Sequence, residues 1–309
     1  MEAEDRFHVP VMGKEVIELL IDDPDGIYID GTAGNGGHTR LIVDELSENG
    51  RVIACDLDRR MLEMAEKRLG SMSSRVEFQN CGYHQVAEQI PSDYLPISGY
   101  LLDLGICSVQ LDRQLGFAFK ADNPLDMRFD SGAPLTAADI VNTYSYRELK
   151  QLFREYGELK QASRIAEEIC EYRQRESIET TRQLASIVAQ FFPQNRRSKG
   201  LAQIGQALRI AVNNELDNLK QGLASLTGSL KSGGRMVVIS YHSLEDRIVK
   251  NFIRSHSRES GLPPELEEVL DRRDFRLKNL TSKAMTASRE ELEVNKRARS
   301  ARLRAAAKV

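Results

Sequence analysis

The sequence predicts an α/β protein in which a Rossmann-like, doubly wound sheet is interrupted by an inserted all-helical domain. In the first third of the chain, short apolar runs alternate with helical patterns. Residues 111–213 show helical periodicity and no convincing strand, and the α/β alternation resumes after them. We therefore expect a discontinuous domain formed by residues 1–110 and 214–309, and an inserted helical domain formed by residues 111–213.

The first part of the sheet is predicted from four apolar runs. They are Ile27–Asp30, Arg51–Asp56, Val76–Phe78 and Gly99–Leu104. Helical patterns follow the first two runs, and the second of these patterns passes through Met61–Leu69. Strands separated by helices of this length favour parallel crossovers in a doubly wound sheet.

The inserted domain is predicted from helical periods alone. These periods cover Ala137–Asn142, Tyr146–Tyr156, Gln161–Arg173 and Thr181–Phe191. After the insertion we expect a helix over Asn214–Leu230, a turn at Lys231–Gly234, and a strongly apolar strand over Arg235–Ser240. A weaker signal indicates an edge strand at Phe275–Lys278.

Composition and charge indicate an ordinary globular protein. The chain of 309 residues has 41% hydrophobic residues, 29% charged residues and a formal net charge of -3. The end of the chain is locally basic, with Lys296, Arg297, Arg299, Arg302, Arg304 and Lys308 and no acidic residue among the last fifteen. This end is suited to phosphate contact, or it is simply a solvated tail.

The four cysteines are scattered, with no close pair that could begin a zinc site and no dense set of bridges. They are typical of reduced thiols in a cytosol. The beginning of the chain shows no basic segment followed by an apolar run, and no stretch approaches the length of a membrane span. We therefore expect a cytoplasmic protein without a membrane partner.

The first candidate ligand site is the segment Asp30–His38, which closes the first strand and opens the next helix. Glycines let a backbone approach a ligand and offer amide donors at a helix N-terminus. Gly34 and Gly36 are followed by Thr39 where the dinucleotide fingerprint needs a third glycine, and the ending of a P-loop is missing. The pattern favours a nucleoside without a phosphate chain; the alternative is a merely tight turn.

Two aspartates follow later strands. Asp56 stands where α/β nucleoside-binding folds place an acid that accepts hydrogen bonds from ribose hydroxyls, although it could also cap the next helix, a role that suits Asp58 better. Asp103 follows a buried run at the substrate edge of the sheet, where a carboxylate needs a partner or a function; the alternative is a structural aspartate that caps a loop.

The last candidate cluster is Ser240–Arg247, at the end of the apolar strand after the insertion. Its many hydrogen-bonding side chains indicate a polar pocket wall. A serine hydrolase is not supported because the chain has no Gly-x-Ser-x-Gly elbow. The alternative is that Ser243, Glu245 and Asp246 simply begin a helix.

Together these segments resemble the RsmH or MraW family of bacterial ribosomal RNA methyltransferases, almost from end to end. The resemblance rests on HVPV, DGTAGNGGH, DLGICSVQLD, GFAF, PLDMRFD, QALRIAVNNEL, VVISYHSLEDRIVK and NKRARSARLR. It implies S-adenosylmethionine as cofactor and N(4)-methylation of a cytidine at the ribosomal P site. The implied cofactor-binding residues are Gly34, Gly36, Gly37, His38, Asp56, Tyr83, Asp103 and Gln110.

The implied partner is 16S ribosomal RNA, within the assembled or assembling small ribosomal subunit, and the sequence is compatible with a homodimer. For catalysis we expect Asp103, Ser240 and His242 to grip the base and accept a hydrogen bond from its amine, with no metal needed for the chemistry. The target base must leave its stack. Candidate RNA contacts, besides the basic end, are Arg128, Arg196, Arg197, Lys199, Arg209 and Arg247.

The chain departs from the family pattern in three segments. The departures are Cys107–Gln110, Gly157–Leu159 and Lys199–Gln206, and in the last the family's His, Pro and Arg are absent and Gly205 replaces an aromatic residue. These changes leave open a divergent member that acts as an RNA-binding or assembly protein. A methyltransferase with another substrate is the second alternative, although it would not need the insertion, and an NAD-linked oxidoreductase comes last.

Overall fold

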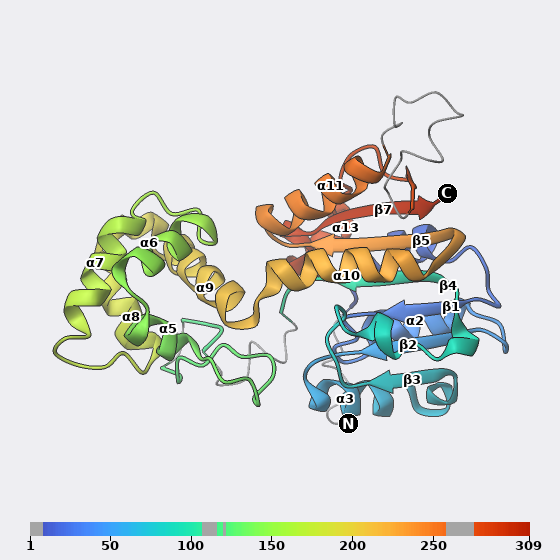
Figure 1. Ribbon diagram of the computed structural model, residues 1–309, viewed down its shortest axis with the longest axis horizontal. Coiled ribbons are helices and arrows are strands. Elements are labelled where there is room, and N and C mark those ends of the chain that lie inside the picture. Colours follow the sequence, from blue (N-terminus) through green and yellow to red (C-terminus); the bar gives the residue numbers. More distant parts are fainter. Residues whose placement is uncertain (1–8, 107–115, 120–121, 258–274) are drawn as a thin grey trace. The chain divides into compact units, whose positions relative to one another are not determined.

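The computed structural model describes residues 9–106, 116–119, 122–257 and 275–309. The chain forms two compact units (Figure 1). The first unit combines Met1–Gly105 with Asp217–Val309, and the second is Ile106–Leu216. The boundaries expected from the sequence, after residues 110 and 213, lie within five residues of these divisions.

The first unit is built on a seven-stranded sheet with the order β3-β2-β1-β4-β5-β7-β6. Neighbours from β3 to β5 are parallel, whereas β7 is antiparallel to both β5 and β6. The strands are β1 (Ile27–Asp30), β2 (Arg51–Cys55), β3 (Val76–Gln79), β4 (Ile97–Asp103), β5 (Leu230–Ser240), β6 (Leu277–Asn279) and β7 (Arg302–Lys308). This parallel part confirms the predicted Rossmann-like sheet. After β1 the chain first adds β2 and β3 on one side of β1, and then crosses over to add β4 on its other side.

Apolar helix faces cover both sides of the sheet. One face packs on α10 and α11, through residues such as Leu223 and Val249. The other packs on α1 and α2, through residues such as Val16 and Ile42. The helices of this unit are α1 (Gly13–Leu20), α2 (Gly37–Glu45), α3 (Arg59–Leu69), α10 (Glu215–Ser229), α11 (Ser243–Ser257) and α13 (Arg289–Val294).

The predicted turn at Lys231–Gly234 is a bulge inside β5. Leu230 pairs with Ile97, and the next pair joins Arg235 to Gly99, so extra residues of β5 lie between two successive pairs. Gly233 has a φ of 78°, which a glycine adopts without steric cost. The Lys231–Gly234 sequence does interrupt regular strand pairing, but β5 continues through it as a bulge and the chain does not reverse direction.

The basic end of the chain is not a solvated tail, so this one of the two interpretations was wrong. Arg302–Lys308 forms β7, and Leu303, Ala305 and Ala306 in it are buried. Leu303 and Ala305 alternate with Arg302 and Arg304 and pack on one side of the sheet, whereas Ala306 packs on the other side. The charges had concealed this alternation.

The second unit is helical, as predicted. Its helices are α5 (Ala137–Thr143), α6 (Tyr146–Glu155), α7 (Ala162–Tyr172), α8 (Thr181–Val188) and α9 (Arg197–Asn213). Capping boxes begin α5, α6 and α8 at Thr136, Ser145 and Thr180. The sequence did not predict α9, the longest of the five.

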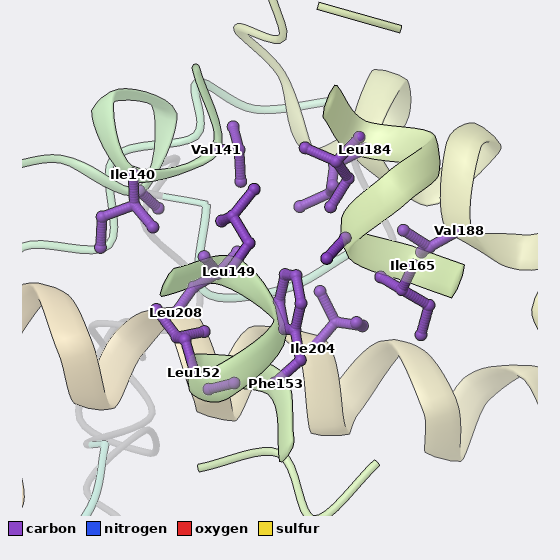
Figure 2. Close-up of a cluster of buried hydrophobic side chains, with 14 of the residues drawn as sticks. Ile140, Val141, Leu149, Leu152, Phe153, Ile165, Leu184, Val188, Ile204 and Leu208 are labelled. Carbon is purple, nitrogen blue, oxygen red and sulfur yellow. The ribbon is translucent and has the colours of Figure 1, made fainter. Parts of the chain in front are cut away.

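Figure 2 shows the core of this unit, a cluster of buried aliphatic side chains around Phe153. Ile204 and Leu208 of α9 belong to the cluster, together with residues of the other four helices. The insertion therefore has a hydrophobic core of its own. Across the described ranges of the chain, no helix combines the length and the apolar character needed to cross a membrane.

Candidate functional site

Three aspartates gather where neighbouring parallel strands end. Asp30 is the last residue of β1, Asp56 follows β2 directly, and Asp103 is the last residue of β4. Strand order reverses at β1, because β2 lies on one side of it and β4 on the other. Open α/β sheets bind their ligands outside the carboxyl ends of the strands at such a switch point. The glycine segment after β1 lies there too.

The glycine segment requires glycine at two positions for different reasons. Gly34 has a φ of 50°, and nothing lies closer than 3.9 Å to the place where a Cβ would stand, so this backbone is open to a ligand. Gly36 has a φ of 80° and caps α2, and a Cβ there would lie 2.9 Å from the Cβ of Ala65. Gly37 then opens α2 as its first residue.

Asp56 holds the glycine segment through its side chain. One carboxylate oxygen accepts a hydrogen bond from the Gly34 amide at 2.9 Å, and the other accepts one from the Asp58 amide at 2.8 Å. Burial raises the pKa of Asp56 to about 6. Asp58 caps α3 by accepting a hydrogen bond from the Arg60 amide, as expected. Asp56 is therefore free of the capping role and retains acceptor capacity for a ligand.

Asp30, the first residue of the candidate segment Asp30–His38 but not one of the expected cofactor-binding residues, is a buried member of the site. Its carboxylate accepts hydrogen bonds from the Thr39 hydroxyl at 2.6 Å and from the Thr32 amide at 3.2 Å. Burial raises the pKa of Asp30. Its place at the end of a buried strand, directly before the glycine segment, was the signal that could have identified it.

Asp103 lies between a tyrosine and a histidine. The Tyr241 hydroxyl donates a hydrogen bond to Oδ1 of Asp103 at 2.8 Å, and Nε2 of His38 lies 3.5 Å from Oδ2. The Asp103 amide donates to the Thr32 hydroxyl at 2.7 Å. Burial and the negative charge of Asp103 raise the pKa of Tyr241, so this hydroxyl remains a donor.

The structure joins Asp103 to Tyr241 rather than to Ser240 or His242. Asp103 pairs with Ile239 across β4 and β5, and side chains alternate between the two faces of a sheet. Tyr241 therefore shares the face of Asp103, whereas the side chain of Ser240 points to the other face. Among the described residues, no hydrogen bond or ion pair connects Asp103 with Ser240 or His242.

His242 is held by Glu245 at the start of α11. Nε2 of His242 lies 3.1 Å from a Glu245 oxygen, and the Glu245 carboxylate also accepts a hydrogen bond from the Tyr241 amide at 2.9 Å. Glu245 is only 3% exposed. The expected alternative, that this cluster begins a helix, is confirmed because α11 starts at Ser243.

Of the two remaining cofactor-binding candidates, Tyr83 lies within the described residues and Gln110 does not. Tyr83 packs beside Gly31, and its ring lies so close to Gly222 that a Cβ there would be 2.6 Å from it. Gln110 lies outside the described residues, as does the whole Cys107–Gln110 segment with its family departure.

Buried polar atoms without partners lie within this site. Both ring nitrogens of His38, which is 6% exposed, and the hydroxyl oxygen of Ser240, which is 1% exposed, make no hydrogen bond in the described part of the chain. An unsatisfied buried polar group is costly unless a ligand or water completes it. With three carboxylates nearby, the site suits a ligand that carries positive charge and hydroxyl groups.

Comparison with known proteins gives a consistent result. A sequence model described as the MraW methylase family matches residues 5–309. The chain is 45% identical, over 96% of both chains, to the ribosomal RNA small subunit methyltransferase H of Syntrophotalea carbinolica. It is 41% identical to the same-named protein of Caldicellulosiruptor bescii, over 98% of this chain and 99% of that one. The identity with the same-named protein of Halothermothrix orenii is 42%, over 98% of each chain.

Proposed function

The chain belongs to the MraW methylase family, and from this premise we propose that it methylates the exocyclic amine of a cytidine in 16S ribosomal RNA with S-adenosylmethionine. The relatives' shared name supports ribosomal RNA of the small subunit as substrate, and the resemblance described above supports the amine of cytidine. One observation carries the proposal: Asp30, Asp56 and Asp103 surround an open glycine segment at the switch point of the sheet.

The proposed cofactor is a sulfonium nucleoside that supplies an electrophilic methyl group. Gly34, Gly36 and Gly37 would let its nucleoside approach the backbone, and Asp56 would accept hydrogen bonds from its ribose. The buried carboxylates lower the energy of a positive charge nearby, and neither ring nitrogen of His38 makes a hydrogen bond in the described part of the chain. Tyr83 and Gln110 complete the proposed set.

Asp103 is the proposed acceptor for an N–H of the cytosine amine. The amine is a poor nucleophile because its lone pair is delocalised into the ring, and a hydrogen bond to a carboxylate helps the nitrogen become tetrahedral. Tyr241 fixes the carboxylate by binding Oδ1, which leaves Oδ2 for other contacts. Ser240 and His242 remain the proposed contacts to the base edge. Methyl transfer is an in-line displacement, so positioning supplies most of the catalysis.

The structure separates the candidate RNA contacts into two groups. Several expected contacts already serve the fold. Arg128 donates to both carboxylate oxygens of Asp126 through Nε and Nη2, and Arg209 binds Glu215 in the same way. Arg304 binds Asp246, and Lys308 donates to the carbonyls of Gly228 and Leu230. The exposed group is Arg196, Arg197, Lys199, Arg247, Lys296, Arg297, Arg299 and Arg302.

The experiment that tests this function uses labelled S-adenosylmethionine and small ribosomal subunits that lack the modification. We expect label on the exocyclic nitrogen of one cytidine, located by nuclease digestion and mass spectrometry. Label on a ring carbon, on a ribose hydroxyl or on protein would overturn the amine assignment. Calorimetry with the cofactor should show saturable heat, whereas a purely RNA-binding assembly protein would show none.

We also propose that the protein acts in the cytoplasm. Small ribosomal subunits are made there, and cysteines are kept reduced. Cys55 and Cys81 are buried free thiols in the structure.

A further inference from the structure

A groove lies on the helical unit between the α6–α7 connection and the beginning of α9. Its volume is about 610 Å³, which lies within the range of pockets that hold small ligands. The residues of its lining that matter here are Glu158, Lys160, Phe192, Arg196, Lys199 and Gly200. We call this feature the α9 groove.

The cations of the α9 groove are unpaired. Lys160, Arg196 and Lys199 are all exposed, and within the described ranges none of them forms an ion pair. Glu158 is the only acid in the lining, and it is engaged in another interaction. Arg128 and Arg209 of the same unit, by contrast, are each neutralised by a carboxylate. The groove thus keeps a positive charge, whereas the charges of Arg128 and Arg209 are compensated.

The sequence around the groove excludes acidic residues over a long stretch. From Thr180 to Asn214 the chain contains five basic residues and no aspartate or glutamate, although its net charge is -3. The α9 helix has no acidic residue in its first turn and no side-chain cap at Arg196. The positive end of the helix dipole therefore adds to the side-chain charges rather than being neutralised by them.

The groove is built by packed residues rather than by loose side chains. A Cβ on Gly200 would lie 2.4 Å from the Phe192 ring, so only glycine lets this ring lie against α9. About one turn further along α9, the Gln203 side chain donates a hydrogen bond to the Gly157 carbonyl at 2.9 Å. Gly200 and Gln203 belong to the segment in which the chain departs from the family pattern. This departure therefore forms a wall of the groove.

We propose that the α9 groove binds a phosphodiester segment of the RNA substrate, a conclusion that rests on the proposed function. Lysine and arginine contact phosphate oxygens without reading sequence, so the groove contributes affinity and register rather than choice of base. Three exposed cations that line one groove are complementary in charge to the repeated phosphates of an RNA strand. A protein partner with an acidic segment is the competing occupant.

The test is a full-length variant that carries Lys160→Gln, Arg196→Gln and Lys199→Gln. Its affinity for a 16S ribosomal RNA transcript is measured over a series of salt concentrations. Each lost phosphate contact reduces the salt slope by about 0.7 to 0.9, so we expect a fall of about 2 to 3 and an affinity weakened about tenfold or more at low salt. Calorimetry should give an unchanged affinity for S-adenosylmethionine, because the substitutions lie in the other unit.

The control is Arg175→Gln, which removes one exposed positive charge of the same unit outside the groove. Arg175 is exposed and lies beyond the far end of α7, whose eleven residues span about 16 Å. We expect the control to reduce the slope by less than about 0.3, well below one full contact. A triple variant with the wild-type slope and affinity would overturn the proposal.

The outcomes also separate this proposal from the proposed function. If wild-type protein binds the transcript but transfers no methyl group to small subunits, the proposed methyltransferase function is wrong. The groove proposal is then still tested by the difference in salt slope between the triple variant and wild type. If the triple variant loses methyl transfer to small subunits but binds the naked transcript as wild type does, the groove contacts ribosomal protein instead. That result would overturn the RNA assignment and leave the methyltransferase function intact.

Discussion

The backbone amide of Gly34 donates a hydrogen bond to the carboxylate of Asp56 at 2.9 Å, which ties the glycine segment after β1 to the acid after β2. The two residues are 22 positions apart in the chain. The same carboxylate is the proposed ribose acceptor. Ionisation of Asp56 therefore affects both its hydrogen bond to the glycine segment and its ability to bind the ribose. Burial raises the pKa of that carboxyl to about 6.

The affinity for S-adenosylmethionine should therefore fall in mild acid. The ligand favours ionised Asp56, so affinity is fully present above the folded-state pKa of about 6 and is lost as the pH falls through it. If only the ionised form binds, the dissociation constant at pH 5 should be about tenfold higher than at pH 7. Calorimetry at a series of pH values measures this dependence.

The control for this dependence is Asp56→Asn, which cannot ionise. Its affinity should be low at every pH and should change by less than about twofold between pH 7 and pH 5. Stability has the opposite sign, because a raised pKa means that the folded state binds the proton more tightly than the unfolded state does. Asp56 alone should thus add to the free energy of unfolding as the pH falls from about 6 to about 4. A wild-type affinity that is flat over this range would contradict the assignment of Asp56.

Substitution of Asp103 should separate binding from transfer. For Asp103→Ala we expect an affinity for S-adenosylmethionine within about tenfold of wild type, and a rate of methyl transfer at least about a hundredfold lower. Single-turnover transfer to undermethylated small subunits measures the rate. Unchanged turnover would remove Asp103 from the mechanism.

Tyr241 should act as a positioning residue for that carboxylate. Tyr241→Phe removes the 2.8 Å hydrogen bond to Oδ1 but keeps the ring that packs beside Gly105. We expect kcat to fall about tenfold while KM for the RNA changes less than about threefold, because the acceptor moves but the RNA contacts remain. A purely structural role would instead lower the melting temperature and leave kcat of the folded protein unchanged.

Much of the sheet could be predicted from the sequence because its strands are continuous apolar runs that end in polar residues. Asp56 and Asp58 could even be assigned different roles from their order after β2, and the helix N-cap at Asp58 is confirmed. The helix α9 was missed because glycines and basic residues interrupt its apolar face. Its pattern becomes visible only against the core that covers Ile204 and Leu208.

The interior of the site could not be predicted in the same way. The partner of Asp103 depends on the register of β4 against β5, which pairs Asp103 with Ile239 and so selects Tyr241. A shift by one residue would have selected Ser240, and no local pattern distinguishes the two registers. The unpaired state of Arg196 and Lys199 likewise depends on which acids lie within reach in the folded chain.

Gly36 should be intolerant of alanine. Its φ of 80° is strained for any other residue, and a Cβ would meet Ala65 at 2.9 Å. We expect Gly36→Ala to lower the free energy of unfolding by about 1–3 kcal/mol and to weaken cofactor binding. Gly228→Ala is the matched control, since its Cβ would meet nothing within 4 Å and it lies inside α10. There alanine should be neutral or stabilise by up to about 1 kcal/mol in denaturant titrations. Equal effects of both substitutions would contradict this account of the glycine segment.

Arg304 should contribute to stability rather than to RNA affinity. Its guanidinium donates to Oδ1 of Asp246 at 2.7 Å, and the two side chains are only 12% and 13% exposed, so removing one partner leaves a poorly solvated charge. We expect Arg304→Gln to lower the free energy of unfolding by about 1–3 kcal/mol, whereas Glu18→Ala, which breaks the exposed pair with Lys14, should cost less than about 0.5 kcal/mol. The salt slope for RNA binding by folded Arg304→Gln should match that of wild type, because this charge is already neutralised by Asp246. A reduced slope with unchanged stability would instead return β7 to the RNA-binding surface.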